Sequence, residues 1–286
     1  MFGLTSPVPR ARSEHLLLES PRRDLPVTLV ILAVTFVVFL LLALQPGLVG
    51  VQRVDDGWQA YMLEHRSSAL TALALLFDPF GYALVLQPIR LAIACFLVLR
   101  RRWWHLAAFV PAIVLSEILV GPLKDAYDRA RPLGSLAVTG GTAFPSGQSI
   151  AASATLVAAM IALVGPGRHR AFWGVAAFGL TLAVGLRLTY LGMHWLSDWI
   201  GGALLGTSIA LVTTVIVGAG QRRRSATGAR EQDDSDLLVA LPQDSGQREA
   251  EPLRRRALEG VLLRARRRDA VGGWDRARVE DSRLPG

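Results

Sequence analysis

Long apolar blocks separated by short polar segments run through most of the chain. A helix that crosses a hydrocarbon core of about 30 Å needs roughly 20 apolar residues. Six segments reach or nearly reach this length, so the sequence predicts an all-α, polytopic membrane protein with six spans. The predicted spans are 27–44, 81–99, 103–120, 149–164, 172–188 and 196–217.

Arginine clusters at the ends of these spans predict the orientation. The clusters lie at 22–23, 100–102, 168–170 and 222–224. All four fall on one side if all six spans are present, and positive charge favours the cytoplasmic side. We therefore expect a multi-pass protein of the cell membrane with both termini in the cytoplasm. The connections expected to face outward are 45–80, 121–148 and 189–195.

Composition narrows the remaining classes. Of 286 residues, 51% are hydrophobic, and the formal net charge is +8. The arginines flank apolar blocks instead of lining one soluble face, so we expect no nucleic acid partner. The single cysteine, Cys95, excludes an intrachain disulfide. Residues 1–26 are polar and interrupted by proline, so we expect no cleavable signal peptide.

Three regions are predicted: a cytoplasmic segment 1–26, a transmembrane domain 27–218 and a cytoplasmic tail 219–286. The tail is polar, which predicts disorder. Within it, an apolar stripe and arginines at 252–268 fit either a basic amphipathic helix on anionic lipid or a solvated run of charge. In the first outer connection, 58–77 alternates apolar and polar residues at helical spacing and predicts a helix on the outer surface.

Arg90 interrupts the second predicted span. A charge within the membrane is costly and is either paired or functional. Glu117 in the third span lies at a depth that a long arginine can reach, which favours an Arg90–Glu117 ion pair. A direct role for Arg90 at a substrate headgroup is the alternative.

Lys124 is the one lysine in a chain with thirty arginines, and it begins the segment KDAYDRARP in the second outer connection. A compact ammonium can contact a single phosphate oxygen where a planar guanidinium needs more room. Its position seven residues before Arg131 favours a specific point-charge role over chance survival.

Pro145-Ser146-Gly147 stands at the start of the fourth predicted span. Free N–H groups and the positive end of the helix dipole make such a start an anion site, and Ser146 can add a hydroxyl donor. Proline and serine are also ordinary helix starters, so the tripeptide alone is a weak signal.

His194 and Asp198 are four residues apart in HWLSD. This spacing predicts that both lie on one helix face, so that the carboxylate takes the Nδ1 proton and leaves Nε2 free to attack. A nucleophile with an orienting carboxylate is typical of covalent catalysis.

In chain order, K-x6-R-P, P-S-G and H-x3-D, each beside an outer connection, resemble the type 2 phosphatidic acid phosphatase (PAP2) superfamily over roughly residues 50–218. The resemblance implies a six-helix bundle with an active site on the extracytoplasmic face. It also implies metal-free hydrolysis of a phosphate ester or diphosphate through a phosphohistidine, with no cofactor. By matching positions it implies that Lys124 and Arg131 clamp phosphate oxygens, Ser146 and Gly147 donate to the same group, His194 is the nucleophile and Asp198 orients it.

Two positions depart from the family pattern. The second motif ends in Gln148 where the family has a histidine that acts as general acid, although the amide can still hydrogen-bond a phosphate. In the third motif the arginine expected at position 188 is instead Arg187. One residue rotates a helical side chain by about 100°, so Arg187 reaches the phosphate only if the backbone is irregular or its stem bends round.

The missing acid bears on the substrate. A general acid contributes typically 10²- to 10⁴-fold, and it matters most for a poorly stabilised alkoxide leaving group. Gln148 therefore favours a diphosphate such as undecaprenyl diphosphate over phosphatidic acid. His65 is a possible replacement acid, and Asp125 and Asp128 are possible proton carriers, although a surface role and pairing with nearby arginines are simpler interpretations.

The sequence thus favours a membrane lipid phosphatase acting on a lipid phosphate in the bilayer. A phosphotransferase is a variant within this class. The alternatives are a catalytically attenuated protein that binds lipid phosphate or acts as a scaffold, and a transporter-like protein with an accidental motif match. The sequence makes no prediction about oligomeric state.

Overall fold

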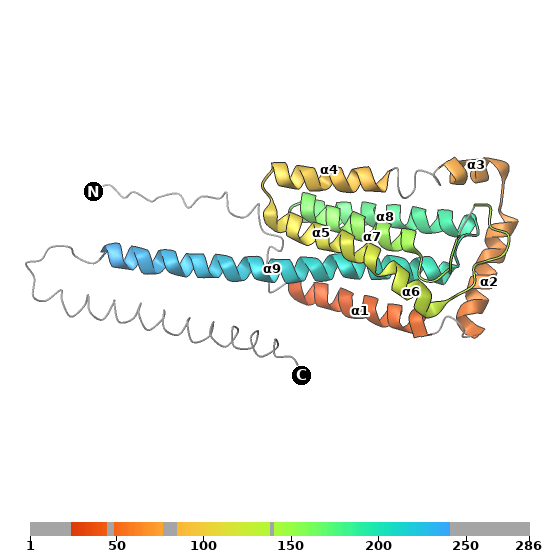
Figure 1. Ribbon diagram of the computed structural model, residues 1–286, viewed down its shortest axis with the longest axis horizontal. Coiled ribbons are helices and arrows are strands. Elements are labelled where there is room, and N and C mark those ends of the chain that lie inside the picture. The colour runs from red at the N-terminus through yellow and green to blue at the C-terminus, as the bar shows by residue number, and fades with distance from the viewer. Residues whose placement is uncertain (1–23, 45–48, 77–84, 138–139, 241–286) are drawn as a thin grey trace, which may run out of the picture. The chain divides into compact units, whose positions relative to one another are not determined.

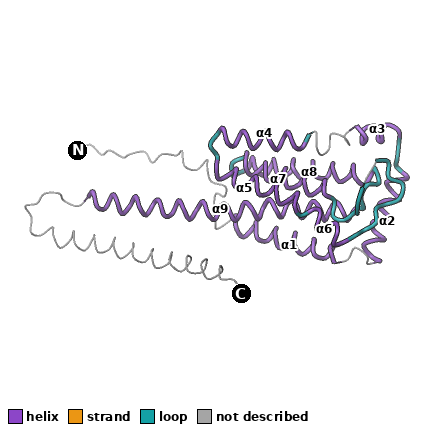
Figure 2. Tube along the Cα trace, in the orientation of Figure 1, coloured by secondary structure: helices purple, strands orange, loops and turns teal. Residues whose placement is uncertain are grey.

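A computed structural model describes residues 24–44, 49–76, 85–137 and 140–240, and the elements within these ranges are helices, with no strand among them (Figures 1 and 2). The helices are α1 Asp24–Leu44, α2 Val49–Glu64, α3 Ser68–Leu76, α4 Leu86–Leu99, α5 Trp103–Ile118, α6 Val120–Tyr127, α7 Gly147–Leu163, α8 Arg168–Tyr190 and α9 Leu196–Ala240. The all-α prediction is confirmed. The chain divides into two compact units, Met1–Gln221 and Arg222–Gly286.

Several helices have the length and apolar composition of membrane spans. Within the described part of the chain, three are long enough to cross a bilayer: Trp103–Tyr127, Arg168–Tyr190 and Leu196–Ala229. Shorter apolar helices cover Thr28–Leu41, Leu86–Leu99 and Gly147–Leu163. These six segments overlap the six predicted spans, and the chain is a membrane protein. The number of spans and the outward face of the site stay predictions.

Two predictions about helix boundaries are wrong. The surface helix expected over 58–77 is two helices, α2 and α3, because the chain turns at His65–Ser67 and the Ser67 hydroxyl accepts a hydrogen bond from Leu70 N–H at 3.3 Å. Phe77 lies outside the described residues. The disorder expected from residue 219 does not begin there, since α9 continues to Ala240. No proline interrupts 219–240, and each residue added to an existing helix gains a hydrogen bond. The segment 252–268 lies outside the described residues.

The core of the first unit is built on α7, which packs between α5 and α8. Its buried residues are mostly alanine, serine and threonine, which allow neighbouring helices to approach closely. On α9, a Cβ at Gly202 would lie 2.6 Å from the Ser146 carbonyl oxygen. A Cβ at Gly206, one turn on, would overlap the Ile150 carbonyl oxygen and the Ser153 hydroxyl. Glycine at these positions therefore brings α9 against the first turns of α7.

The predicted Arg90–Glu117 ion pair is confirmed. Arg90 is only 4% exposed, and its guanidinium also donates to Thr155 Oγ1 at 2.8 Å and to the Ala151 carbonyl oxygen at 3.2 Å. These contacts link α4, α5 and α7. Because they occupy the guanidinium inside the bundle, they favour the structural role of Arg90 over a role at a headgroup.

Candidate active site

The third motif does not form the helix face that the spacing predicted. α9 begins at Leu196, and His194 precedes it, in a turn that contains Gly192 at φ +72°. Asp198 lies in the first turn of α9, where its Oδ2 accepts a hydrogen bond from Trp195 N–H at 2.8 Å. The prediction of a shared helix face is therefore wrong, because the turn ends α8 and α9 starts two residues after the histidine. The turn nevertheless brings the two side chains together.

His194 is buried between the carboxylate of Asp198 and the guanidinium of Arg131. Its Nδ1 lies 3.5 Å from Asp198 Oδ2, within ion-pair distance but without hydrogen-bond geometry. Its Nε2 lies 3.3 Å from Arg131 Nη1. Since guanidinium only donates, Nε2 is the acceptor, which places the proton on Nδ1, toward Asp198. The Nδ1 side of the imidazole thus faces the Asp198 carboxylate, and the Nε2 side faces Arg131.

The first motif is held against backbone carbonyl groups. Arg131 donates from Nη1 to the Met193 carbonyl oxygen at 2.6 Å, and from Nε and Nη2 to Gly141 and Gly140 at 2.9 Å. Lys124 Nζ donates to the Thr142 carbonyl oxygen. The loop before α7 thus fixes both cations of the first motif, and Arg131 connects that loop to the histidine turn.

The second motif begins α7 as predicted. Ser146 is the N-cap residue, and its hydroxyl oxygen accepts from Ser149 N–H at 3.4 Å and from the Ser149 hydroxyl at 3.0 Å. Its own N–H donates to the Asp198 carbonyl oxygen at 3.1 Å, so α7 and α9 are joined at their first turns. Gly147 packs closely on α6, since a Cβ there would lie 3.1 Å from Val120. Ser146 is fully buried, so it acts here through the helix start.

Arg187 reaches the second motif. Its guanidinium donates to the side-chain oxygen of Gln148. α8 runs without interruption from Arg168 to Tyr190, so Arg187 makes this contact from a regular helix. The amide oxygen of Gln148 is therefore occupied by a cation, which leaves its NH₂ group as the donor.

The sequence did not point to Arg129, which is 8% exposed and surrounded by polar partners. It donates to Asp198 Oδ1, Asp55 Oδ2 and Ser197 Oγ, each at 2.7 Å, and to Gln52 Oε1 at 2.8 Å. Asp55 is 1% exposed and also accepts from Ser197 N–H at 2.9 Å. The position of Arg129 between Lys124 and Arg131 was the sequence feature that could have pointed to it. Its partner on α2, Asp55, lies far away in the sequence.

The alternative proton carriers are less well placed. His65 is exposed, and its Nδ1 lies 2.8 Å from the carbonyl oxygen of Tyr61 on α2. Asp125 and Asp128 are also exposed. Their expected pairing with nearby arginines is wrong, because Arg129 pairs with Asp55 and Asp198 while Arg131 contacts carbonyl groups.

The electrostatics of the site favour a neutral histidine. Burial lowers the pKa of His194, and the positive charges of Arg131 and Lys124 lower it further, while Asp198 opposes the shift. Burial also lowers the pKa of Arg131, again opposed by Asp198. Among the described residues, no group of three or more His, Cys, Asp and Glu side chains could hold a metal ion.

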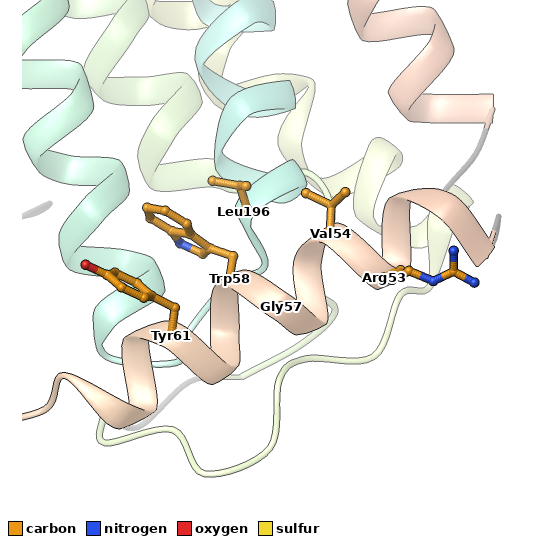
Figure 3. Close-up of a pocket in the computed structure, with 6 residues that line it drawn as sticks. All are labelled: Arg53, Val54, Gly57, Trp58, Tyr61 and Leu196. Carbon is orange, nitrogen blue, oxygen red and sulfur yellow. The ribbon is translucent and has the colours of Figure 1, made fainter.

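An open apolar pocket of about 480 Å³ lies between α2 and the start of α9. It is lined by Arg53, Val54, Gly57, Trp58, Tyr61 and Leu196. Figure 3 shows Val54 and Trp58 on the side of α2 that faces Leu196, with the Arg53 guanidinium directed away. One of the residues that line the pocket, Leu196, is two residues after His194 in the sequence.

Fold and site together define an all-helical membrane protein in which basic side chains gather around a buried histidine. Residues 105–222 match the model of the PAP2 superfamily. The matched region contains all eight site residues named from the sequence, which range from Lys124 to Asp198.

Two solved structures are similar to this chain. The first transmembrane PAP2 type phosphatidylglycerolphosphate phosphatase from Bacillus subtilis is similar with a TM-score of 0.60 and 23% identity, over 65% of this chain and 94% of that one. LpxE from Aquifex aeolicus is similar with a TM-score of 0.46 and 22% identity, over 59% of this chain and 97% of that one. A comparison with curated protein sequences gives no significant match.

Proposed function

We propose that this protein is an integral membrane lipid phosphatase that hydrolyses a lipid phosphate or diphosphate through a phosphohistidine on His194. The observation that carries the proposal is the position of His194 Nε2, 3.3 Å from Arg131 Nη1, with Asp198 on the Nδ1 side. Arg131 and Lys124 supply the positive charge that a transferred phosphoryl group requires. The arginine clusters favour an active site that faces outward.

The proposed reaction has two displacements. The Nε2 lone pair attacks phosphorus, a P–N bond forms, and the P–O bond to the lipid breaks, with its electron pair leaving on the lipid oxygen. Water then attacks phosphorus and loses a proton to the solvent, and the P–N bond breaks with its electron pair returning to Nε2, which releases inorganic phosphate and restores the neutral imidazole. Arg131 and Lys124 stabilise the oxygens of the transferred group, and Asp198 holds the Nδ1 proton. If an acceptor other than water attacked the phosphohistidine, the phosphoryl group would pass to that acceptor and the protein would be a phosphotransferase.

The Gln148–Arg187 contact supports the preference for a diphosphate. Gln148 cannot donate a proton to the departing oxygen, and Arg187 holds its amide oxygen in place. A lipid monophosphate can leave as an anion without such a proton, whereas a diacylglycerol alkoxide is a much poorer leaving group. We therefore expect undecaprenyl diphosphate to be a better substrate than phosphatidic acid.

The variant Gln148→His tests this leaving-group argument. It is expected to raise phosphatidate turnover by about 10²-fold or more, within the range that a general acid contributes, and to leave undecaprenyl diphosphate turnover nearly unchanged. Phosphate release by the purified protein in detergent measures both. Equal effects on the two substrates would contradict the substrate preference. Background release by the parent protein on both would favour the attenuated lipid-phosphate-binding protein instead.

The lowered pKa of His194 predicts the pH dependence. The neutral imidazole is the nucleophile, so activity is retained while His194 is neutral and is lost as it becomes protonated. The acid limb of kcat/KM is therefore expected below the ordinary histidine value of 6.5. A profile of phosphate release between about pH 4.5 and 8.5 measures it. An acid limb above 6.5 would contradict the lowered pKa of His194.

A further inference from the structure

Arg129 joins three separate segments of the chain by hydrogen bonds. Its Nη1 donates to Ser197 Oγ and Asp198 Oδ1 at the start of α9, and its Nη2 donates to Asp55 Oδ2 and Gln52 Oε1 on α2. All four distances are 2.7 or 2.8 Å. A planar guanidinium fixes the directions of its donors, so Arg129 sets the position of α9 relative to α2 at this end of the bundle.

Asp55 anchors the first turn of α9 from outside that helix. Its Oδ1 accepts from Ser197 N–H at 2.9 Å, and its Oδ2 accepts from the Ser197 hydroxyl at 2.6 Å. The first N–H groups of a helix have no partner within the helix, so Asp55 supplies one for α9. Asp55 lies outside the region that matches the superfamily, 105–222. The contact therefore depends on α2 of this chain.

The network determines which oxygen of Asp198 faces the histidine. Arg129 holds Oδ1, and this leaves Oδ2 for Trp195 N–H and for His194 Nδ1. We propose that Asp55 and Arg129 are positioning residues that fix Asp198 and, through it, the orientation of His194. The catalytic meaning of this role rests on the proposed function. The geometric role of the two residues does not.

Because the network contains charges of both signs, removing Asp55 and removing Arg129 should shift the pKa of His194 in opposite directions. His194 faces Asp198 from α9, Arg131 from the loop before α7 and Lys124 from α6, and beyond Asp198 lie Arg129 and Asp55. Removing the negative charge of Asp55 leaves Arg129 paired with Asp198 alone, so the pKa of His194 should fall. Removing the positive charge of Arg129 leaves two carboxylates, so the pKa of His194 should rise.

The experiment compares Asp55→Asn, Arg129→Gln and Arg129→Lys in the full-length protein in detergent. Exchange of the imidazole C2 hydrogen, followed by peptide mass spectrometry, measures the pKa of His194 whether or not the protein turns over. We expect a lower pKa in Asp55→Asn, a higher pKa in Arg129→Gln and little change in Arg129→Lys. We also expect kcat to fall by about 10²-fold in each variant, because a displacement of about 1 Å can have this effect, with KM nearly unchanged.

Two exposed positions provide matched controls. Glu64→Gln removes a carboxylate from α2, and Arg168→Gln removes a guanidinium from the start of α8. Both should leave the pKa of His194 and kcat at parent values. Asp55→Asn keeps an acceptor for Ser197 N–H and is expected to fold, so it decides the question even if Arg129→Gln does not fold.

The outcomes separate this inference from the proposed function. A pKa of His194 that does not move in folded Asp55→Asn would overturn the positioning role, even in an active enzyme. A pKa that moves as expected in a protein that releases no phosphate would keep the positioning role and reject the phosphatase. In Asp55→Asn or Arg129→Gln, loss of kcat with an unchanged pKa of His194 would show general loss of structure and would also count against the proposal.

Discussion

Replacing His194 by alanine is expected to abolish phosphate release from both undecaprenyl diphosphate and phosphatidate. Without Nε2 no P–N bond can form, and loss of a covalent nucleophile lowers the rate on the order of 10⁴-fold or more. Phosphate release in detergent measures the loss. Brief incubation with substrate labelled in its terminal phosphate should give an acid-labile, alkali-stable label on the parent protein and no label on the variant.

His65→Ala is the matched control for this experiment, because His65 is exposed and contacts the carbonyl oxygen and the ring of Tyr61 on α2. It should retain parent activity. A large loss of phosphate release in His65→Ala would support the interpretation that His65 is the replacement general acid. Full activity in His194→Ala, with normal expression and melting behaviour, would remove the phosphohistidine from the mechanism.

Gly206→Ala is expected to have the largest effect on stability. The added Cβ would overlap the Ile150 carbonyl oxygen and the Ser153 hydroxyl, and neither belongs to a long, flexible side chain that could move aside. α9 and α7 must therefore separate, at about 3 kcal/mol or more for such overpacking. The melting midpoint in detergent, followed by tryptophan fluorescence, should fall by about 5 °C or more. Activity should also fall, because the Ser146–Asp198 backbone hydrogen bond depends on the same approach.

Gly179→Ala is the control for Gly206→Ala. Gly179 lies in the interior of α8 with nothing within 4 Å of an added Cβ. Since alanine is the better helix former by about 1 kcal/mol, this variant should melt at or slightly above the parent midpoint. Equal melting of the two variants would contradict the close contact between α7 and α9.

The local motifs of this site could be predicted from the sequence, and the structure brings them together. Lys124 and Arg131 are fixed by one loop, Ser146 caps α7, and His194 lies beside Asp198. The cap at Ser146 and the His194–Asp198 pair each span at most four residues, so spacing and residue type carry them, whereas the contact of Lys124 with the loop spans 18 residues. The helix face expected for the third motif was wrong because spacing alone does not show where a helix begins.

The contacts that close the site could not be predicted from one sequence. Asp55 and Ser197 are 142 residues apart, and Arg129 lies between them in the chain. Their pairing depends on where α2 crosses the bundle, which no local pattern encodes. An acidic residue on an amphipathic surface helix has the pattern of a solvated residue, yet Asp55 is 1% exposed. The reach of Arg187 to Gln148 likewise depends on how α8 packs against α7.

The separation of Asp55 from Ser197 has a consequence for biosynthesis. A ribosome that adds 5–20 residues per second needs roughly 7 to 28 seconds to make the intervening 142 residues. During that interval Asp55 and then Arg129 have left the ribosome without the first turn of α9, and their charges must remain hydrated. The start of α9 therefore completes this hydrogen-bond network only once Ser197 has been synthesised. A nascent chain stalled before Ser197 should present both charged groups to chaperones and proteases.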